Sequence, residues 1–213
     1  MPVSGLLDFP DWPFDTGPVV IECCRFDDAV DPQLIESAAQ GIEVPLGIAP
    51  GSARWREWAL GRLVAQRAAR RAGVASGIGH VADSGAPRLD ESDWAVSIAH
   101  TSGFVLAAVA PMPMGIDVER RDRDVSRLLR SFSPAEHDVS VSVGPIRALV
   151  AKEAAAKATE LGLGGSLARW PLIDVELCGN TPTINIASPD DRIVEVRLFD
   201  WLDHVVGVAV VRA

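Results

Sequence analysis

The feature that most constrains the fold is a dense apolar run that leads directly into two carboxylates. The run FVLAAVA (104–110) predicts a buried strand. After a proline-marked corner, GIDVE (115–119) has the pattern of another buried strand but contains Asp117 and Glu119. Burying one unpaired carboxylate costs several kcal/mol of folding free energy. The chain must therefore supply a partner for these charges, unless the strand has one face in water.

Strand alternation places both carboxylates on one face. Asp117 and Glu119 point the same way, whereas Ile116 and Val118 point toward the opposite face. Two carboxylates this close repel each other, and a cation between them removes the repulsion. Because no histidine or cysteine lies nearby in the sequence, oxygen-only ligation favours Mg²⁺ before Zn²⁺. From this stretch alone, an edge strand with one face in water remains the simpler explanation.

A later segment of the chain favours the cation site over the solvent-facing edge strand. The stretch 145–161 begins with Pro145 and is alanine-rich on almost every side, which indicates a buried helix whose charges need partners. Glu153 and Lys157 are four residues apart and share a face. On a surface they would form an ordinary ion pair. Beside the acidic strand, Glu153 would complete a cation site and Lys157 would meet a phosphate ligand.

His100 begins the segment HTSG (100–103) between two apolar runs, which predicts a hairpin with His100 held in its turn. A turn histidine can donate to phosphate oxygens. The alternative is a residue that caps the hairpin.

Composition limits the class of protein. The chain has 213 residues, of which 48% are hydrophobic, and contains no apolar run of about 18 residues, so we expect no membrane span. The N-terminus does not resemble a secretion signal. Three cysteines form neither a disulfide framework nor a CxxC metal pair, which favours a cytoplasmic location.

The charge distribution is uneven. A net charge of −9 argues against nucleic acid as a partner. Arginines nevertheless cluster in 54–71 and 120–130. These segments could bind a compact polyanion or dock an acidic partner, and solvated helix faces are the alternative.

The pattern predicts an α+β fold of two related halves. The echo between GFVLAAVA (103–110) and HVVGVAVVRA (204–213) suggests the duplication. We expect helices at 31–40, 52–72 and 145–161, and strands at 17–24, 94–99, 104–110, 115–119, 172–177, 183–187, 193–199 and 204–213. The segment 121–139 has a helical pattern that becomes irregular, and Ser133 is a helix-cap candidate before Pro134 and Glu136.

Taken in order, these segments resemble the 4'-phosphopantetheinyl transferase superfamily, specifically its larger, monomeric, surfactin-type branch. The resemblance runs from Arg54 to Gly165, about half the chain. RWREWALGRLVAQRA (54–68) is similar to the family's arginine helix, GAP (85–87) to its adenine-side loop, and SIAHT (97–101) to its serine–histidine turn. GIDVE (115–119) is similar to its acidic strand, FSPAEH (132–137) to its Phe-Ser-x-x-Glu segment, and KEAAAKATELGLG (152–164) to its Lys-Glu-Ala-x-x-Lys helix.

The resemblance implies two similar α/β halves related by a pseudo-two-fold, with the active site between them. Residues 1–112 would form the N-terminal half, which carries coenzyme A-binding elements. Residues 113–213 would form the C-terminal half, with the metal strand and the Lys-Glu helix.

It also implies roles for individual residues. Asp117, Glu119 and Glu153 would hold Mg²⁺ on the pyrophosphate of coenzyme A. Glu153 and Lys157 would be catalytic, with Glu153 as the base for the serine proton. The coenzyme A contacts would be Arg54 at the 3'-phosphate end, His100 and Lys157 at the phosphates, and Gly85, Pro87 and Lys152.

The implied reaction transfers 4'-phosphopantetheine from coenzyme A to a serine of a carrier protein and releases 3',5'-ADP. The partners would be acyl or peptidyl carrier domains of polyketide, fatty-acid or nonribosomal-peptide synthesis. Because such carriers are typically acidic, residues 120–130 are the predicted docking surface. The resemblance further implies a monomer.

The chain departs from the family pattern at three positions, Ala86, Ala99 and Leu149, where the family has lysine, serine and tryptophan. These departures motivate an alternative, a non-catalytic relative that binds coenzyme A or a carrier protein as a scaffold. A structural α+β domain with chance motifs would bind no metal.

Overall fold

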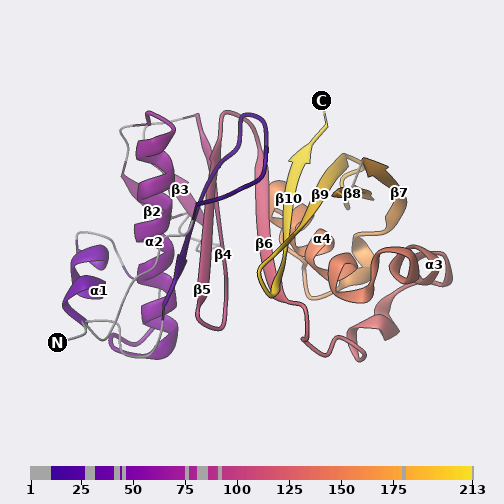
Figure 1. The fold of residues 1–213 in the computed structure, drawn as a ribbon, viewed down its shortest axis with the longest axis horizontal. Coiled ribbons are helices and arrows are strands. Elements are labelled where there is room, and N and C mark those ends of the chain that lie inside the picture. The colour runs from indigo at the N-terminus through magenta and orange to yellow at the C-terminus, as the bar shows by residue number, and fades with distance from the viewer. Residues whose placement is uncertain are drawn as a thin grey trace. The chain divides into compact units, whose positions relative to one another are not determined.

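The computed structural model describes residues 11–26, 32–40, 44, 47–74, 77–80, 86–90, 93–178 and 181–212. The chain divides into two compact units, unit 1 (Met1–Pro111) and unit 2 (Met112–Ala213), and both mix helices with antiparallel sheets (Figure 1). In the described part of the chain, no helix combines the length and the apolar composition that a membrane crossing requires.

Unit 1 packs a long helix, α2, against a small antiparallel sheet (Figure 1). The sheet has the strand order β1-β5-β4, and β2 and β3 form a separate two-stranded sheet. The elements of unit 1 are β1 (Val20–Arg25), α1 (Pro32–Ala39), α2 (Ala53–Arg71), β2 (Ile78–His80), β3 (Pro87–Leu89), β4 (Ala95–Thr101) and β5 (Phe104–Ala110).

Local sequence explains the limits of α2. The Ser52 side chain accepts a hydrogen bond from the Trp55 backbone N–H at 3.1 Å, which caps the first turn. Gly73 follows the last turn with a φ of +76°, a conformation that glycine adopts without strain. The apolar face of α2 is buried against the sheet, and this core includes Leu60, Val64, Ala68, Cys24, Val105 and Val109.

The predicted hairpin is present, but β4 is longer than expected. His100 pairs with Val105, and Thr101 pairs with Phe104, so the turn is only Ser102 and Gly103. Gly103 adopts a φ of +72°, which allows the tight reversal. His100 therefore lies near the end of a strand and not in the turn, which corrects the sequence-based placement.

Unit 2 packs helix α4 against β6, β10 and β9 of a five-stranded antiparallel sheet with the order β6-β10-β9-β8-β7 (Figure 1). The elements of unit 2 are β6 (Met114–Arg120), η1 (Leu128–Ser131), α3 (Pro134–Val143), α4 (Pro145–Ala158), η2 (Leu167–Arg169), β7 (Leu172–Cys178), β8 (Thr181–Ala187), β9 (Ile193–Trp201) and β10 (His204–Val211).

The segment 121–139 differs from its predicted helical start. It begins with a turn and irregular backbone, and its regular helix α3 begins only at Pro134. The cause is a capping box in which Ser133 Oγ accepts from the Glu136 backbone N–H and the Glu136 carboxylate accepts from the Ser133 backbone N–H. A proline at the first helical position fits this start.

Two glycines let α4 lie close to the sheet. A Cβ on Gly115 of β6 would stand 2.1 Å from the Ala154 backbone oxygen of α4. A Cβ on Gly207 of β10 would stand 2.8 Å from Val150 Cγ1. Because Gly207 is directly opposite Asp117 in the β6–β10 pairing, the sheet presents Asp117 next to a position without a side chain.

Each unit thus joins one long helix to an antiparallel sheet, which agrees with the expected α+β class. The three-stranded sheet of unit 1 and the five-stranded sheet of unit 2 differ in strand number and order. The pseudo-two-fold relation between the halves stays a prediction.

Candidate functional site

Asp117 is the most unusual carboxylate of unit 2. It lies on β6 and is only 4% exposed. Its Oδ1 atom accepts a hydrogen bond from Lys157 Nζ at 2.7 Å, whereas its buried Oδ2 atom has no hydrogen-bond partner among the described residues. Burial raises the pKa of Asp117, although the nearby Lys157 charge acts in the opposite direction. A buried oxygen without a partner is costly, so the site favours a further cation or donor.

Helix α4 supplies Glu153 and Lys157 to the same place. Lys157 Nζ donates to the Ile116 backbone oxygen at 3.1 Å as well as to Asp117, so it is fixed to β6 by two hydrogen bonds. Burial raises the pKa of the half-buried Glu153, and the neighbouring Asp117 charge raises it further. This effect indicates that Asp117 lies close enough to Glu153 to interact with it. The predicted convergence of β6 and α4 is therefore present.

Glu119 lies two residues beyond Asp117 and shares its face of β6. Its side chain is 12% exposed and forms an ion pair with Arg123, four residues further along the chain. Glu119 is thus paired with Arg123, and Asp117 is paired with Lys157, so both carboxylates have a cationic partner within the chain.

The donor set suits a hard divalent cation. Asp117, Glu119 and Glu153 offer only oxygen atoms, and the partnerless Oδ2 of Asp117 is available as a ligand. Among the described residues, no three histidine, cysteine, aspartate or glutamate side chains converge tightly enough to hold a metal ion as they stand. The ion pairs to Lys157 and Arg123 use two of the three carboxylates. The residues fit the metal chemically, and the three-carboxylate ligation stays a prediction.

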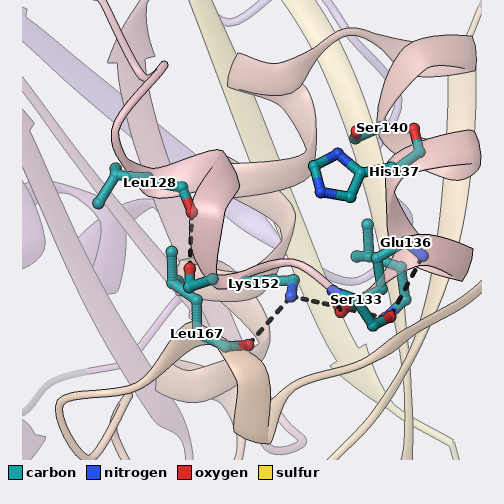
Figure 2. Close-up of polar contacts among 9 residues, drawn as sticks. Leu128, Ser133, Glu136, His137, Ser140, Lys152 and Leu167 are labelled. Carbon is teal, nitrogen blue, oxygen red and sulfur yellow. Dashed lines mark hydrogen bonds and ion pairs between the residues drawn. The ribbon is translucent and has the colours of Figure 1, made fainter.

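Lys152, a predicted coenzyme A contact, is buried inside unit 2. Its side chain is 0% exposed, forms an ion pair with Glu136 and donates to the Leu167 backbone oxygen at 3.0 Å. Figure 2 shows Lys152 directed at Glu136 and Leu167. Its ammonium also lies 4.1 Å from the ring centroid of Phe132. The ammonium is fully buried with these partners, so this geometry lends no support to a contact between Lys152 and coenzyme A, which stays a prediction.

The predicted binding residues of unit 1 lie on α2, β3 and β4. Arg54 is exposed in the first turn of α2. His100 on β4 has a half-exposed side chain, and its Nε2 lies 3.3 Å from Oε2 of Glu57 on α2. Pro87 is half-buried at the start of β3. Gly85 lies outside the described residues.

Two of the departures from the family pattern are positions in hydrophobic cores. Leu149 on α4 and Ala99 on β4 are each 1% exposed. At these positions the chain differs in packing, and neither side chain is accessible to a ligand.

Arg62 belongs to the arginine cluster 54–71, but the sequence interpretation gave it no individual role. It lies on α2 and is 3% exposed, and within the described residues its Nε atom has no hydrogen-bond partner. Its guanidinium stands 5.5 Å from the ring centroid of Trp58, and burial lowers its pKa to about 10. No described carboxylate pairs with it. The detectable sign was an arginine inside the apolar stretch LGRLV (60–64).

Comparison with known proteins supports one family. Residues 50–110 match the sequence model of the 4'-phosphopantetheinyl transferase N-terminal domain. The match begins just before α2 and ends with β5, so it covers Arg54, Arg62, Pro87 and His100. No curated protein matches the chain.

Proposed function

We propose that this protein is a surfactin-type 4'-phosphopantetheinyl transferase that moves the phosphopantetheine arm of coenzyme A to a serine of an acyl or peptidyl carrier protein. The observation that carries the proposal is the buried Asp117. One of its oxygens pairs with Lys157, and the other has no hydrogen-bond partner in the described part of the chain. The family match at residues 50–110 supports the same activity independently, because it lies in the other unit.

Asp117, Glu119 and Glu153 would hold Mg²⁺. When bound, the ion would supply positive charge next to the pyrophosphate of coenzyme A. The support is the oxygen-only donor set and the partnerless Asp117 Oδ2.

Lys157 and Glu153 have complementary tasks in the transfer. The serine hydroxyl attacks the phosphorus that bears the pantetheine arm, and the bond from that phosphorus to the leaving 3',5'-ADP breaks. The Lys157 ammonium, held by Asp117 and the Ile116 carbonyl, stabilises the negative charge on the phosphates. Glu153 accepts the serine proton, because its carboxylate is the group of α4 that lies next to Lys157 and Asp117.

Residues of unit 1 would bind other parts of coenzyme A. Arg54 would contact the 3'-phosphate end, and His100 would contact phosphate oxygens. Gly85 and Pro87 would lie on the adenine side. We add Arg62, because a buried guanidinium that pairs with no carboxylate of the described residues fits a phosphate ligand.

Replacing Arg62 by leucine separates binding from stability. We expect the melting temperature to rise by about 2–4 °C, because the substitution removes a buried charge that has no carboxylate partner among the described residues. The affinity for coenzyme A should fall at least about tenfold, because a charge-assisted phosphate contact is lost. Calorimetric titration with coenzyme A and thermal unfolding measure both effects.

Arg70→Leu is the matched control, since Arg70 is an exposed arginine of the same helix. Its affinity for coenzyme A should stay within about twofold of the unmodified protein. Unchanged affinity in Arg62→Leu would exclude Arg62 from the binding site.

The carrier protein would dock on residues 120–130. Within this segment Arg120 pairs with Asp122, and Arg123 pairs with Glu119. Arg127 and Arg130 are exposed and have no ion-pair partner among the described residues, so they are the arginines best suited to an acidic carrier.

The remaining parts of the proposal rest on the family resemblance. They are a pseudo-two-fold relation between the halves and a monomeric state. A cytoplasmic location rests instead on the cysteine content.

The direct test is incubation of the protein with coenzyme A, Mg²⁺ and a panel of apo-carrier proteins, followed by intact-mass measurement. We expect a carrier to gain one phosphopantetheine, with release of one 3',5'-ADP. Binding of coenzyme A without a mass gain on any carrier would contradict the transferase and favour a binding scaffold. Absence of both binding and transfer would exclude both functions.

A further inference from the structure

The turn after β6 brings a second cation against the carboxylates. The Arg123 backbone N–H donates to the Arg120 backbone oxygen at 3.2 Å, which folds the chain back after the strand. This reversal places the Arg123 guanidinium in an ion pair with Glu119. The Arg123 charge also acts to lower the pKa of both Asp117 and Glu153, although burial keeps each pKa raised overall. Arg123 therefore acts on all three carboxylates.

The two cations near these carboxylates differ in how firmly they are held. Lys157 lies on a buried helix and donates to both Asp117 and a backbone carbonyl. The Arg123 side chain is 44% exposed and has only Glu119 as an ion-pair partner among the described residues. An exposed guanidinium loses little when it turns into water, because solvent replaces its hydrogen bonds. Arg123 is thus the cation that can leave.

We propose that Arg123 is an internal counter-ion that competes with a divalent cation for Glu119 and so sets the metal concentration at which the site fills. This inference rests on the proposed function, since it concerns the same carboxylates. Glu119 cannot offer its oxygens fully to a metal while they are paired with a guanidinium. Each binding event must therefore displace Arg123, and the cost of that displacement weakens the apparent affinity for the metal.

Arg120→Gln provides a matched control for Arg123→Gln. Arg120 is likewise exposed, at 46%, and lies near the end of β6, but its partner is Asp122 and not a predicted metal ligand. Both substitutions remove one positive charge from the same turn. Any difference between them therefore reports the contact with Glu119 and not the general field of the segment.

The test is a titration of the full chain with Mn²⁺, a spectroscopic substitute for Mg²⁺, in which electron paramagnetic resonance measures the free ion, with and without coenzyme A. We expect Arg123→Gln to lower the Kd for Mn²⁺ about fivefold. We expect Arg120→Gln to change that Kd by less than about twofold. Thermal unfolding of each variant verifies that it is folded.

Two results would overturn the inference, and they are distinguishable. An unchanged or higher Kd in Arg123→Gln, with Mn²⁺ binding normally to the unmodified protein, would show that Arg123 does not compete with the metal. This result would leave the proposed transferase intact. Absence of Mn²⁺ binding in every variant, with and without coenzyme A, would overturn the inference together with the metal dependence of the proposed function.

Discussion

Replacing Lys152 by methionine should lower the free energy of unfolding by about 3–5 kcal/mol, because it leaves the Glu136 carboxylate buried without its cation. The pair is fully enclosed, with side-chain exposures of 0% and 4%. Glu136 also accepts the Leu172 and Ser133 backbone N–H groups, so it cannot turn away to find solvent. Urea denaturation followed by circular dichroism measures the loss.

Arg147→Met is the matched control for this prediction. Arg147 lies on the same helix and pairs with Asp200, but both side chains are partly exposed, at 28% and 42%. We expect its loss to cost less than about 1 kcal/mol. The double variant Lys152→Met/Glu136→Leu should recover part of the stability that Lys152→Met loses, because no buried charge remains. Full stability in Lys152→Met alone would show that the pair is not buried as described.

Gly115→Ala should damage both stability and activity. Its Cβ would meet the Ala154 oxygen at 2.1 Å and the Ala158 nitrogen at 2.5 Å, and these are backbone atoms that cannot rotate away. Either β6 or α4 must shift, at a cost of about 3 kcal/mol or more. The shift separates Asp117 from Lys157 and Glu153, and a displacement of about 1 Å can slow catalysis about 100-fold. Denaturation and transfer assays measure the two losses.

Gly207→Ala distinguishes close packing in general from the particular role of Gly115. Its Cβ would stand 2.8 Å from Val150 Cγ1, a side-chain atom that can move, and 3.3 Å from the Val150 oxygen. We expect a smaller loss of stability, about 1–2 kcal/mol. If Gly115→Ala were no more harmful than Gly207→Ala, the close contact between β6 and α4 would not be what positions the carboxylates.

Much of the site could be predicted because it depends on local periodicity. The two-residue alternation of GIDVE placed Asp117 and Glu119 on one face, and the four-residue spacing placed Glu153 and Lys157 together. The apolar surroundings of 145–161 indicated that its charges need partners, and the structure provides Asp117 for Lys157. These inferences use only neighbours in the chain and the shapes of helices and strands.

Other features depend on contacts between distant segments. Lys152 and Lys157 are five residues apart, so they lie on different sides of α4, and only the fold shows that Glu136 is the partner of Lys152. The pairing of Glu119 with Arg123 requires the backbone turn after β6, which the sequence did not indicate. The burial of Arg62 likewise depends on the distant segments that pack against α2, and the sequence of the helix alone does not show it.

The central claim is that the carboxylates of β6 and α4 serve phosphopantetheine transfer. The measurement that tests it most directly is the rate of mass gain of an apo-carrier protein with the unmodified chain, Asp117→Asn and Asp122→Asn. Asp122 follows β6 closely, but its side chain is 69% exposed and paired with Arg120. We predict transfer by the unmodified chain, a rate at least about 100-fold lower in Asp117→Asn, and a rate close to the unmodified one in Asp122→Asn. Transfer by Asp117→Asn at the unmodified rate would contradict the account.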